Sequence, residues 1–169
     1  MLVVAAAEAL AQDQQSGTAR RIVVSLEDRK LAVLEGDKVV KTYQTAVGAK
    51  ASPSPTGVYK IVSNVADPTW YHKGKVVRPG KANPVGTRWL GLSLKGYGIH
   101  GTNMPSSIGH AASHGCIRMR NREVEELSTM VAVGDPVELY AQRTPELDRI
   151  FGTVLVAGTA EPSTTVAVQ

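Results

Sequence analysis

The sequence contains a single cysteine, so no disulfide can form within the chain. A lone thiol is a small buried hydrophobe, a metal ligand or a nucleophile. Aromatic residues make up only 5% of the chain, and no apolar run approaches the roughly 18 residues that a membrane-spanning helix needs. Neither sign of charge dominates enough to suggest nucleic-acid binding, because 19 Lys and Arg face 15 Asp and Glu. The resulting charge of +4 suits an anionic surface or substrate.

The chain has 169 residues, of which 43% are apolar, which is typical of one globular domain with short extensions. We expect that domain over residues 21–141. Residues 1–20 include Ala9-Leu10-Ala11, which resembles a signal peptidase site, but no basic residue precedes Arg20. This start fits a truncated secretory signal or a disordered terminus. Residues 142–169 are expected to form a C-terminal extension with a disordered end.

Alternating, β-branched apolar residues predict that the domain is mainly β, with one main helix and short extra helical turns. The expected strands cover residues 22–25, 30–34, 38–47, 57–63, 89–94, 97–100, 117–119 and 137–140. Residues 64–88 are expected to be a long irregular loop. The helix is expected over residues 121–131, with Asn121 as its N-cap and Val124 and Leu127 on its buried face.

Three of the four histidines lie close to the cysteine in sequence, at His100, His110 and His114. A thiol with a pKa of about 8.5 is mostly protonated at neutral pH, so a catalytic cysteine needs a nearby base. His114 is two residues from Cys116; in an extended chain the two side chains would be about 6 to 7 Å apart, which is long for proton transfer. We therefore assign His100 as the base. Gly115 would let a substrate carbonyl approach the backbone, where N–H groups could stabilise an oxyanion.

These residues resemble the signature of the L,D-transpeptidases, cysteine enzymes that cross-link bacterial peptidoglycan. The resemblance is carried by Ile99-His100-Gly101-Thr102 and Ser113-His114-Gly115-Cys116-Ile117-Arg118. Two upstream segments extend it: Asn83-Pro84-Val85-Gly86-Thr87-Arg88-Trp89-Leu90, and Pro55-Thr56-Gly57 before a strand. It covers about residues 21–141, which it identifies as a catalytic domain.

The resemblance implies a β-sandwich and a two-step acyl transfer without a cofactor or metal. Cys116 would attack the stem-tetrapeptide bond before the terminal D-Ala, and an amine would then resolve the thioester. His100 would be the base, with the Gly101 carbonyl orienting it. Family members with Ser at the Gly101 position differ from this chain. The oxyanion site would comprise His114, Gly115 and Cys116, and substrate would be bound by Arg118, Ser113 and Trp89.

The same resemblance implies the partners and the location. We expect a monomer that acts on peptidoglycan stem peptides in the periplasm or cell wall, with no nucleic-acid partner. Carbapenem-type β-lactams are the expected inhibitors. The acceptor could be the diamino acid of another stem, a lipoprotein lysine, a D-amino acid or water.

Other classes of protein remain alternatives. Water as the acceptor would make the enzyme an L,D-carboxypeptidase or another cysteine peptidase of the cell wall. His100, His110, His114 and Cys116 could instead form the zinc site of a hydrolase, although the spacing of His110 and His114 suits a helix and the intervening residues do not. A binding module without catalysis is the remaining alternative.

Overall fold

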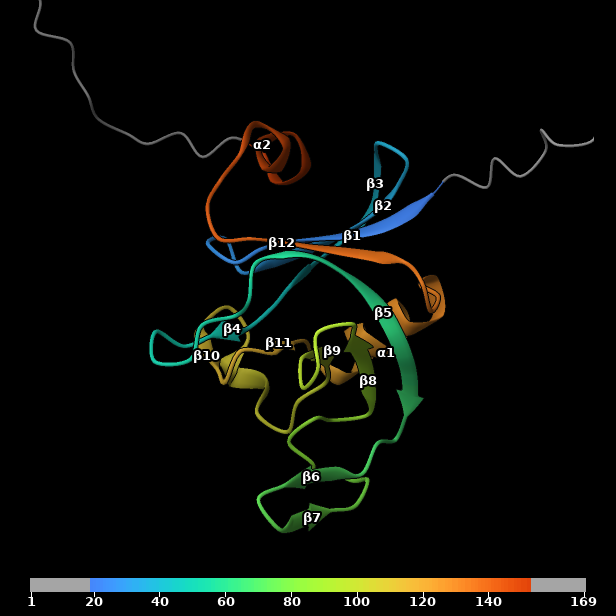
Figure 1. Ribbon diagram of the computed structural model, residues 1–169, viewed down its shortest axis with the longest axis vertical. Coiled ribbons are helices and arrows are strands. Elements are labelled where there is room, and N and C mark those ends of the chain that lie inside the picture. Colours follow the sequence, from blue (N-terminus) through green and yellow to red (C-terminus); the bar gives the residue numbers. More distant parts are fainter. Residues whose placement is uncertain (1–18, 153–169) are drawn as a thin grey trace, which may run out of the picture.

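In the computed structural model of the chain (Figure 1), residues 19–152 are described. We expected a truncated signal or disordered N-terminus over residues 1–20 and a disordered end of the C-terminal extension. Residues 1–18 and 153–169, on which these expectations mainly fall, lie outside the described range. No helix in the described range is long and apolar enough to cross a membrane.

Strands dominate the described residues, as the sequence predicts. The strands are β1 (Arg20–Ser25), β2 (Lys30–Glu35), β3 (Lys38–Gln44), β4 (Val47–Gly48), β5 (Gly57–Ala66), β6 (Trp70–His72), β7 (Lys75–Val77), β8 (Arg88–Leu92), β9 (Gly98–His100), β10 (Ala111–Ser113), β11 (Ile117–Arg118) and β12 (Pro136–Tyr140). The helices are α1 (Asn121–Met130) and α2 (Pro145–Phe151), with a short 3-10 turn at Pro105–Ser107.

One curled sheet organises the fold. Its eight strands follow the order β11-β9-β8-β5-β12-β1-β2-β3, while β4 with β10 and β6 with β7 form two small pairs. The long strand β5 pairs with β12 through its first residues and with β8 through its last ones, and the register shifts between Ile61 and Ser63. Such an irregularity bends and twists a strand. The β1, β2 and β12 half of the sheet therefore faces the β8, β9 and β11 half (Figure 1).

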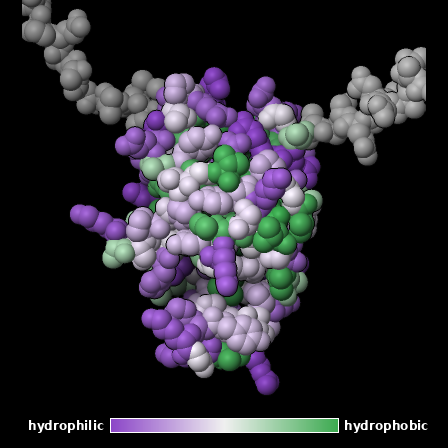
Figure 2. All heavy atoms as spheres, viewed as in Figure 1, coloured by the Kyte–Doolittle hydropathy of each residue, from purple (hydrophilic) through white to green (hydrophobic). Residues whose placement is uncertain are grey.

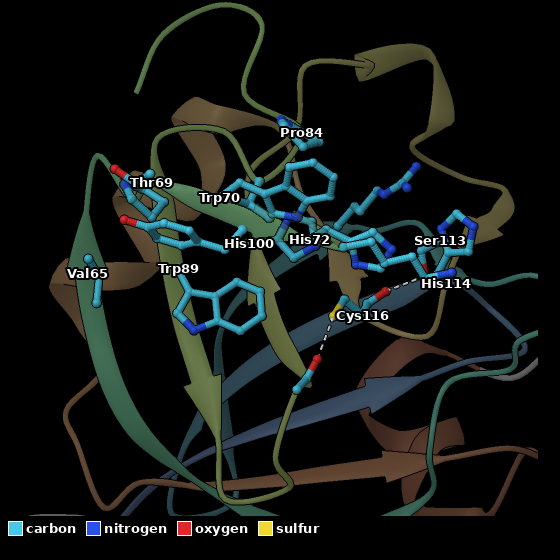
Figure 3. A pocket seen from close by; sticks show the side chains of 16 residues that line it. Val65, Thr69, Trp70, His72, Pro84, Trp89, His100, Ser113, His114 and Cys116 are labelled. Atoms are coloured by element: carbon cyan, nitrogen blue, oxygen red, sulfur yellow. Dashed lines mark hydrogen bonds between the residues drawn. The ribbon is translucent and has the colours of Figure 1, made fainter. Parts of the chain in front are cut away.

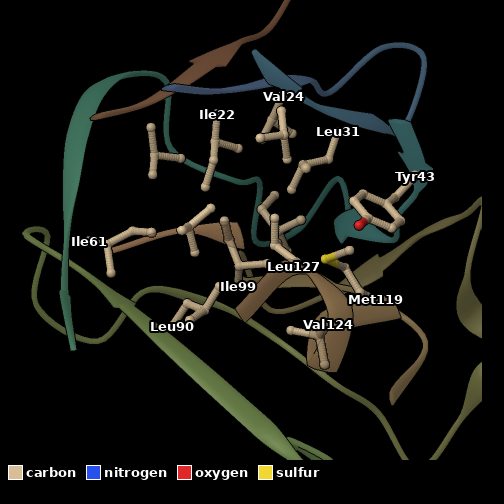
Figure 4. Packing of buried hydrophobic residues seen from close by; sticks show 14 of the residues in the cluster. Ile22, Val24, Leu31, Tyr43, Ile61, Leu90, Ile99, Met119, Val124 and Leu127 are labelled. Atoms are coloured by element: carbon tan, nitrogen blue, oxygen red, sulfur yellow. The ribbon is translucent and has the colours of Figure 1, made fainter. Parts of the chain in front are cut away.

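The main core fills the space between the two halves (Figure 4). Ile22, Val24 and Leu31 of one half face Leu90 and Ile99 of the other, and each of these side chains is fully buried. The helix α1 closes this core with the side chains of Val124 and Leu127, which lie on one helical face because they are three residues apart.

The predicted N-cap of α1 is wrong. The cap is Arg120, whose extended backbone precedes the helix, and the Glu123 carboxylate accepts a hydrogen bond of 3.4 Å from its N–H. Asn121 is instead the first helical residue, and its side-chain Oδ1 accepts from the backbone N–H of Thr102 at 2.9 Å. The asparagine therefore holds the loop that follows β9, which is a tertiary contact that a local capping pattern does not reveal.

Two predicted segments differ in the structure. The expected strand over residues 38–47 is interrupted after Gln44, because Ala46 forms a reciprocal backbone bridge with Arg118 and the next residues pair with β10. The expected irregular loop over residues 64–88 contains the end of β5 and the hairpin formed by β6 and β7. We call residues 70–77 the β6–β7 hairpin.

A second helix extends the packed unit beyond the predicted domain end. Thr144 caps α2 by accepting a hydrogen bond from the N–H of Leu147 at 3.3 Å, and Pro145 occupies the first turn, where it needs no donor. Leu147 is fully buried against Val23, Ala32 and Leu34, on the opposite face of the sheet from the main core. The expected extension over residues 142–169 thus begins as part of the fold.

Candidate active site

Cys116 lies in a tight turn between β10 and β11. The side chain of Ser113 braces this turn, since its Oγ donates to the Cys116 carbonyl at 2.6 Å and accepts from the Gly115 N–H at 3.0 Å. Gly115 has a φ of +112°. A Cβ at this position would lie 2.7 Å from Cε1 of Tyr97, so both the backbone conformation and the space require glycine. His114 and Cys116 therefore do not lie on an extended strand, so the separation expected for an extended chain does not apply to them.

His100 ends strand β9, directly beside the strand that follows the cysteine. The parallel pairing of β9 and β11 places His100 opposite Arg118. The imidazole is only 5% exposed, and its Nδ1 lies 2.6 Å from the Gly101 carbonyl oxygen. Because a carbonyl can only accept, Nδ1 carries the proton and Nε2 keeps its lone pair. The Trp89 ring stacks on the imidazole at 5.5 Å between ring centroids.

The space around Gly101 explains why the hydrogen-bond partner of His100 is a backbone carbonyl rather than a side chain. A Cβ on Gly101 would lie 2.2 Å from Oδ1 of Asn121 and 3.1 Å from the N of Thr87. The asparagine that holds the loop after β9 therefore leaves no room for a serine side chain at this position.

Burial sets the protonation of the two reactive groups. Burial lowers the pKa of His100 to about 4, opposed by its hydrogen bond to Gly101 and assisted by the nearby Arg118 charge. Burial also raises the pKa of the Cys116 thiol, while a backbone hydrogen bond from Gly98 and the Arg118 charge oppose that rise. At neutral pH the resting pair is therefore a thiol and a neutral imidazole.

Both groups line one pocket of about 1030 Å³ (Figure 3). The predicted residues that contribute to its wall are Trp89, His100, Ser113, His114, Cys116 and Arg118. The Cys116 Sγ, which is half-buried, also contacts the carbonyl of Gly96 at 3.7 Å. Within residues 19–152, the Arg118 guanidinium forms no ion pair, so its charge is available to a ligand in the pocket.

The zinc alternative has no support in the described part of the chain. The side chain of His110 is exposed and does not line the pocket. No group of three or more His, Cys, Asp or Glu residues between residues 19 and 152 is arranged to hold a metal ion.

The β6–β7 hairpin forms a wall of this pocket that was not predicted from the sequence. Trp70, Tyr71, His72 and Lys73 all line the pocket, and the rings of Trp70 and His72 stack at 5.4 Å. The sequence feature that could have predicted this hairpin is Lys73-Gly74, where both residues adopt positive φ in a two-residue turn. Lysine is not a usual residue for the first position of such a turn, so the signal is weak.

Asn83 fixes the base of this hairpin. It is fully buried, and its Nδ2 donates to the Pro68 carbonyl at 2.7 Å, with longer contacts of 3.4 Å to the carbonyls of Val77 and Arg78. Its Oδ1 accepts from the N–H of Val85 at 3.0 Å. One side chain therefore ties both ends of the hairpin to the turn that precedes β8.

Comparisons with known proteins identify the family of this chain. Residues 19–139 match the family described as YkuD, the L,D-transpeptidase catalytic domain. The chain is 45% identical over 119 residues to the protein YkuD of Bacillus licheniformis, which is named as an L,D-transpeptidase. That alignment covers 70% of this chain and 64% of the relative, so the chain spans less than two thirds of the length of YkuD.

Solved structures share the fold. The catalytic domain of the Enterococcus faecium L,D-transpeptidase superposes with a TM-score of 0.60 at 27% identity, covering 73% of this chain and 98% of that domain. The Ldtfm-avibactam carbamoyl enzyme superposes with a TM-score of 0.62 at 26% identity, covering 73% of this chain and 49% of that one. From its family match, its 45% identical relative and the arrangement of its one cysteine, the chain belongs to the L,D-transpeptidase catalytic domain family.

Proposed function

We propose that this chain is a peptidoglycan L,D-transpeptidase with Cys116 as its nucleophile. The observation that carries the proposal is the pocket shared by the half-buried Cys116 thiol and the buried His100, whose Nδ1–H is held by the Gly101 carbonyl. That hydrogen bond leaves Nε2 as the only ring nitrogen able to take a proton. A general base with a fixed tautomer beside a thiol is the pairing that acyl transfer requires.

The first half-reaction follows from the neutral resting pair. As Sγ bonds to the carbonyl carbon of the diamino acid, its proton passes to Nε2 of His100. The tetrahedral intermediate then collapses, its bond to the D-Ala nitrogen breaks, and His100 returns the proton to the leaving amine. D-Ala departs and an acyl thioester remains on Cys116.

The second half-reaction repeats these steps with an acceptor amine. The amine attacks the thioester, His100 removes a proton from it, and the thiol is released with a proton from His100. We propose the diamino acid of a neighbouring stem as the acceptor, with hydrolysis by water as a side reaction. The product is a cross-link that strengthens the cell wall and helps to maintain cell shape.

The oxyanion site needs donors that are not already occupied. The Gly115 N–H is bonded to Ser113 Oγ, so we propose the N–H of Cys116 as the main donor, with His114 beside it. One such donor typically stabilises the transition state by about 2.7 to 4 kcal/mol. Ser113 then acts by holding the turn rather than by binding substrate.

Arg118 and Trp89 are the proposed substrate contacts. The Arg118 guanidinium lines the pocket and has a planar fork that suits a carboxylate, so we assign it to the terminal carboxylate of D-Ala. Trp89 forms part of the wall and also holds the His100 ring by stacking.

The proposed substrate also fixes the place of action and the inhibitors. Peptidoglycan lies outside the cytoplasmic membrane, so we propose the periplasm or cell wall as the location. A thiol that forms acyl thioesters also reacts with strained acyl donors, so we propose carbapenems as inhibitors. The likeness to an avibactam carbamoyl enzyme supports testing that compound as well.

Product analysis with purified disaccharide-tetrapeptide tests the proposal. The wild type is expected to release D-Ala and to form a cross-linked dimer, and Cys116→Ala is expected to form neither. Release of D-Ala without dimer would identify a carboxypeptidase instead. Equal turnover by Cys116→Ala would overturn the cysteine mechanism.

A further inference from the structure

The net charge of the chain is concentrated in one segment. Residues 67–88 contain the basic residues Lys73, Lys75, Arg78, Lys81 and Arg88, against the single acidic residue Asp67. Their balance equals the formal net charge of +4 for the whole chain, so the basic and acidic residues elsewhere cancel. We call Lys73, Lys75, Arg78 and Lys81, which are all exposed, the basic arm.

The charges of the basic arm are not neutralised by the fold. Ion pairs in the described residues involve Arg20, Arg21, Lys41, Arg120 and Arg143, which lie elsewhere. None of the four side chains of the basic arm pairs with a carboxylate between residues 19 and 152. Four like charges that repel one another without compensation favour binding of an anion.

The basic arm reaches the proposed catalytic pocket through one of its residues. Lys73 lines that pocket at the tip of the β6–β7 hairpin, next to the aromatic side chains of Trp70 and Tyr71. In Figure 2, hydrophilic side chains lie at the lower left and bottom right of this end of the molecule, at the place of β6 and β7 in Figure 1, with paler and hydrophobic side chains between them. Because Asn83 ties both ends of the hairpin to the fold, the backbone that carries Lys73 and Lys75 is anchored rather than a free loop.

We propose that the basic arm extends the catalytic pocket with a further subsite, which recognises side-chain carboxylates of an acidic stem peptide. This inference rests on the proposed function, because it assigns the substrate chemistry of the same pocket. Arg118 supplies one positive charge close to the thiol and serves the terminal carboxylate, while the basic arm serves carboxylates further along the peptide. The main expected effect is on capture of the peptide, since exposed charges guide association more than they stabilise the bound state.

A binding experiment in an inactive background tests the site without turnover. Binding of a fluorescently labelled stem tetrapeptide to Cys116→Ala is measured by anisotropy at several NaCl concentrations. Changing Lys73, Lys75, Arg78 and Lys81 to Gln in that background is expected to weaken binding about tenfold at low salt, as several surface charges acting together allow. A matched control changes Lys38, Lys60, Arg122 and Arg149 to Gln, which are exposed residues outside the pocket, and is expected to bind as before.

A peptide with amidated side-chain carboxylates provides a second test that needs no variant of the arm. The amidated peptide is expected to bind Cys116→Ala as weakly as the acidic peptide binds the variant with the four Gln substitutions. Its binding should depend little on the salt concentration. Equal binding of the two peptides would overturn the proposal, and so would equal losses in the arm variant and its control.

Kinetics with the active enzyme then assign the carboxylates to one of two sources. If they belong to the donor stem, neutralising the arm lowers kcat/KM for acyl-enzyme formation; if they belong to the acceptor stem, it raises the acceptor concentration needed for transfer. Carboxylate-dependent binding by an enzyme that fails to acylate would refute the proposed function alone. Normal acylation, with no effect of the four Gln substitutions on binding or transfer, would refute the proposed role of the basic arm alone.

Discussion

At the scale of single residues, burial determines how Cys116 and His100 share a proton. The pKa of the thiol is raised and that of the imidazole is lowered, so neither group is charged at rest. In the proposed mechanism the reactive thiolate forms only as the proton moves to His100 during attack. A protonated thiol resists oxidation, and the absence of a second cysteine prevents an intrachain disulfide.

The pH dependence of acylation follows from His100. As the proposed base, His100 can accept a proton only when it is neutral. Its pKa of about 4 keeps it neutral at pH values well below 6.5, the ordinary pKa of histidine. We therefore predict that kcat/KM for acylation stays high as the pH falls and declines only near pH 4. Initial rates of D-Ala release between pH 3.5 and 8 measure this. A decline centred near pH 6.5 would show that the base is not the buried imidazole.

Gly101 and Asn121 should behave as a coupled pair. Gly101→Ala places a Cβ 2.2 Å from Asn121 Oδ1 and should push the loop away from His100, slowing acylation by at least about tenfold and lowering stability by about 1 to 3 kcal/mol. Asn121→Ala removes the obstructing oxygen, so the double variant should recover part of both losses. A double-mutant cycle on urea unfolding and on acylation measures the coupling. Strictly additive effects would contradict this account of the glycine.

At the scale of elements, the β6–β7 hairpin could not be predicted from local sequence patterns. Its strands have three residues each, which is too short for alternation to be recognised, and its tip uses Lys73 where asparagine or glycine would signal a turn. The turn that contains Cys116 could not be predicted from local sequence either, because the contact of Gly115 with Tyr97 is tertiary. Longer strands such as β1 and β2, rich in buried Val and Leu, could be predicted from sequence alone.

Asn83→Asp tests whether one side chain holds this hairpin in place. The change replaces the donor that faces the Pro68 carbonyl with an acceptor, so the two oxygens would repel one another. We predict faster amide hydrogen exchange in residues 70–77 than in the wild type, with unchanged exchange in β1 and β2. Asn64→Asp, at an exposed asparagine that donates to the Ser128 carbonyl, is the control and should leave the hairpin protected. Unchanged exchange in Asn83→Asp would mean that other contacts fix the hairpin.

At the scale of the whole molecule, the curled sheet unites parts of the site that are distant in sequence. The signature residues His100 and Cys116 could be paired from sequence because the family pattern links them. The remaining walls could not, because they depend on the bend of β5 and on the hairpin that follows it. The helix α2 was also missed, since its seven residues bury only Leu147.

Leu147 should nevertheless contribute to global stability. Its side chain is fully buried between α2 and the outer face of the sheet, so Leu147→Ala is predicted to lower the free energy of unfolding by about 2 to 5 kcal/mol. Val133→Ala, at a side chain that is 63% exposed, should have an effect below about 0.5 kcal/mol. Urea denaturation of both variants compares them. Equal effects would show that α2 is not part of the cooperative unit.

The most direct test of the central claim is the mass of the acyl-enzyme. Wild-type protein mixed with a stem tetrapeptide, and separately with a carbapenem, is examined by intact mass spectrometry and peptide mapping. We predict one covalent adduct at Cys116 in each mixture, formed much more slowly by His100→Ala and absent from Cys116→Ala. No adduct in the wild type, or the same adduct in Cys116→Ala, would contradict catalysis through this thiol.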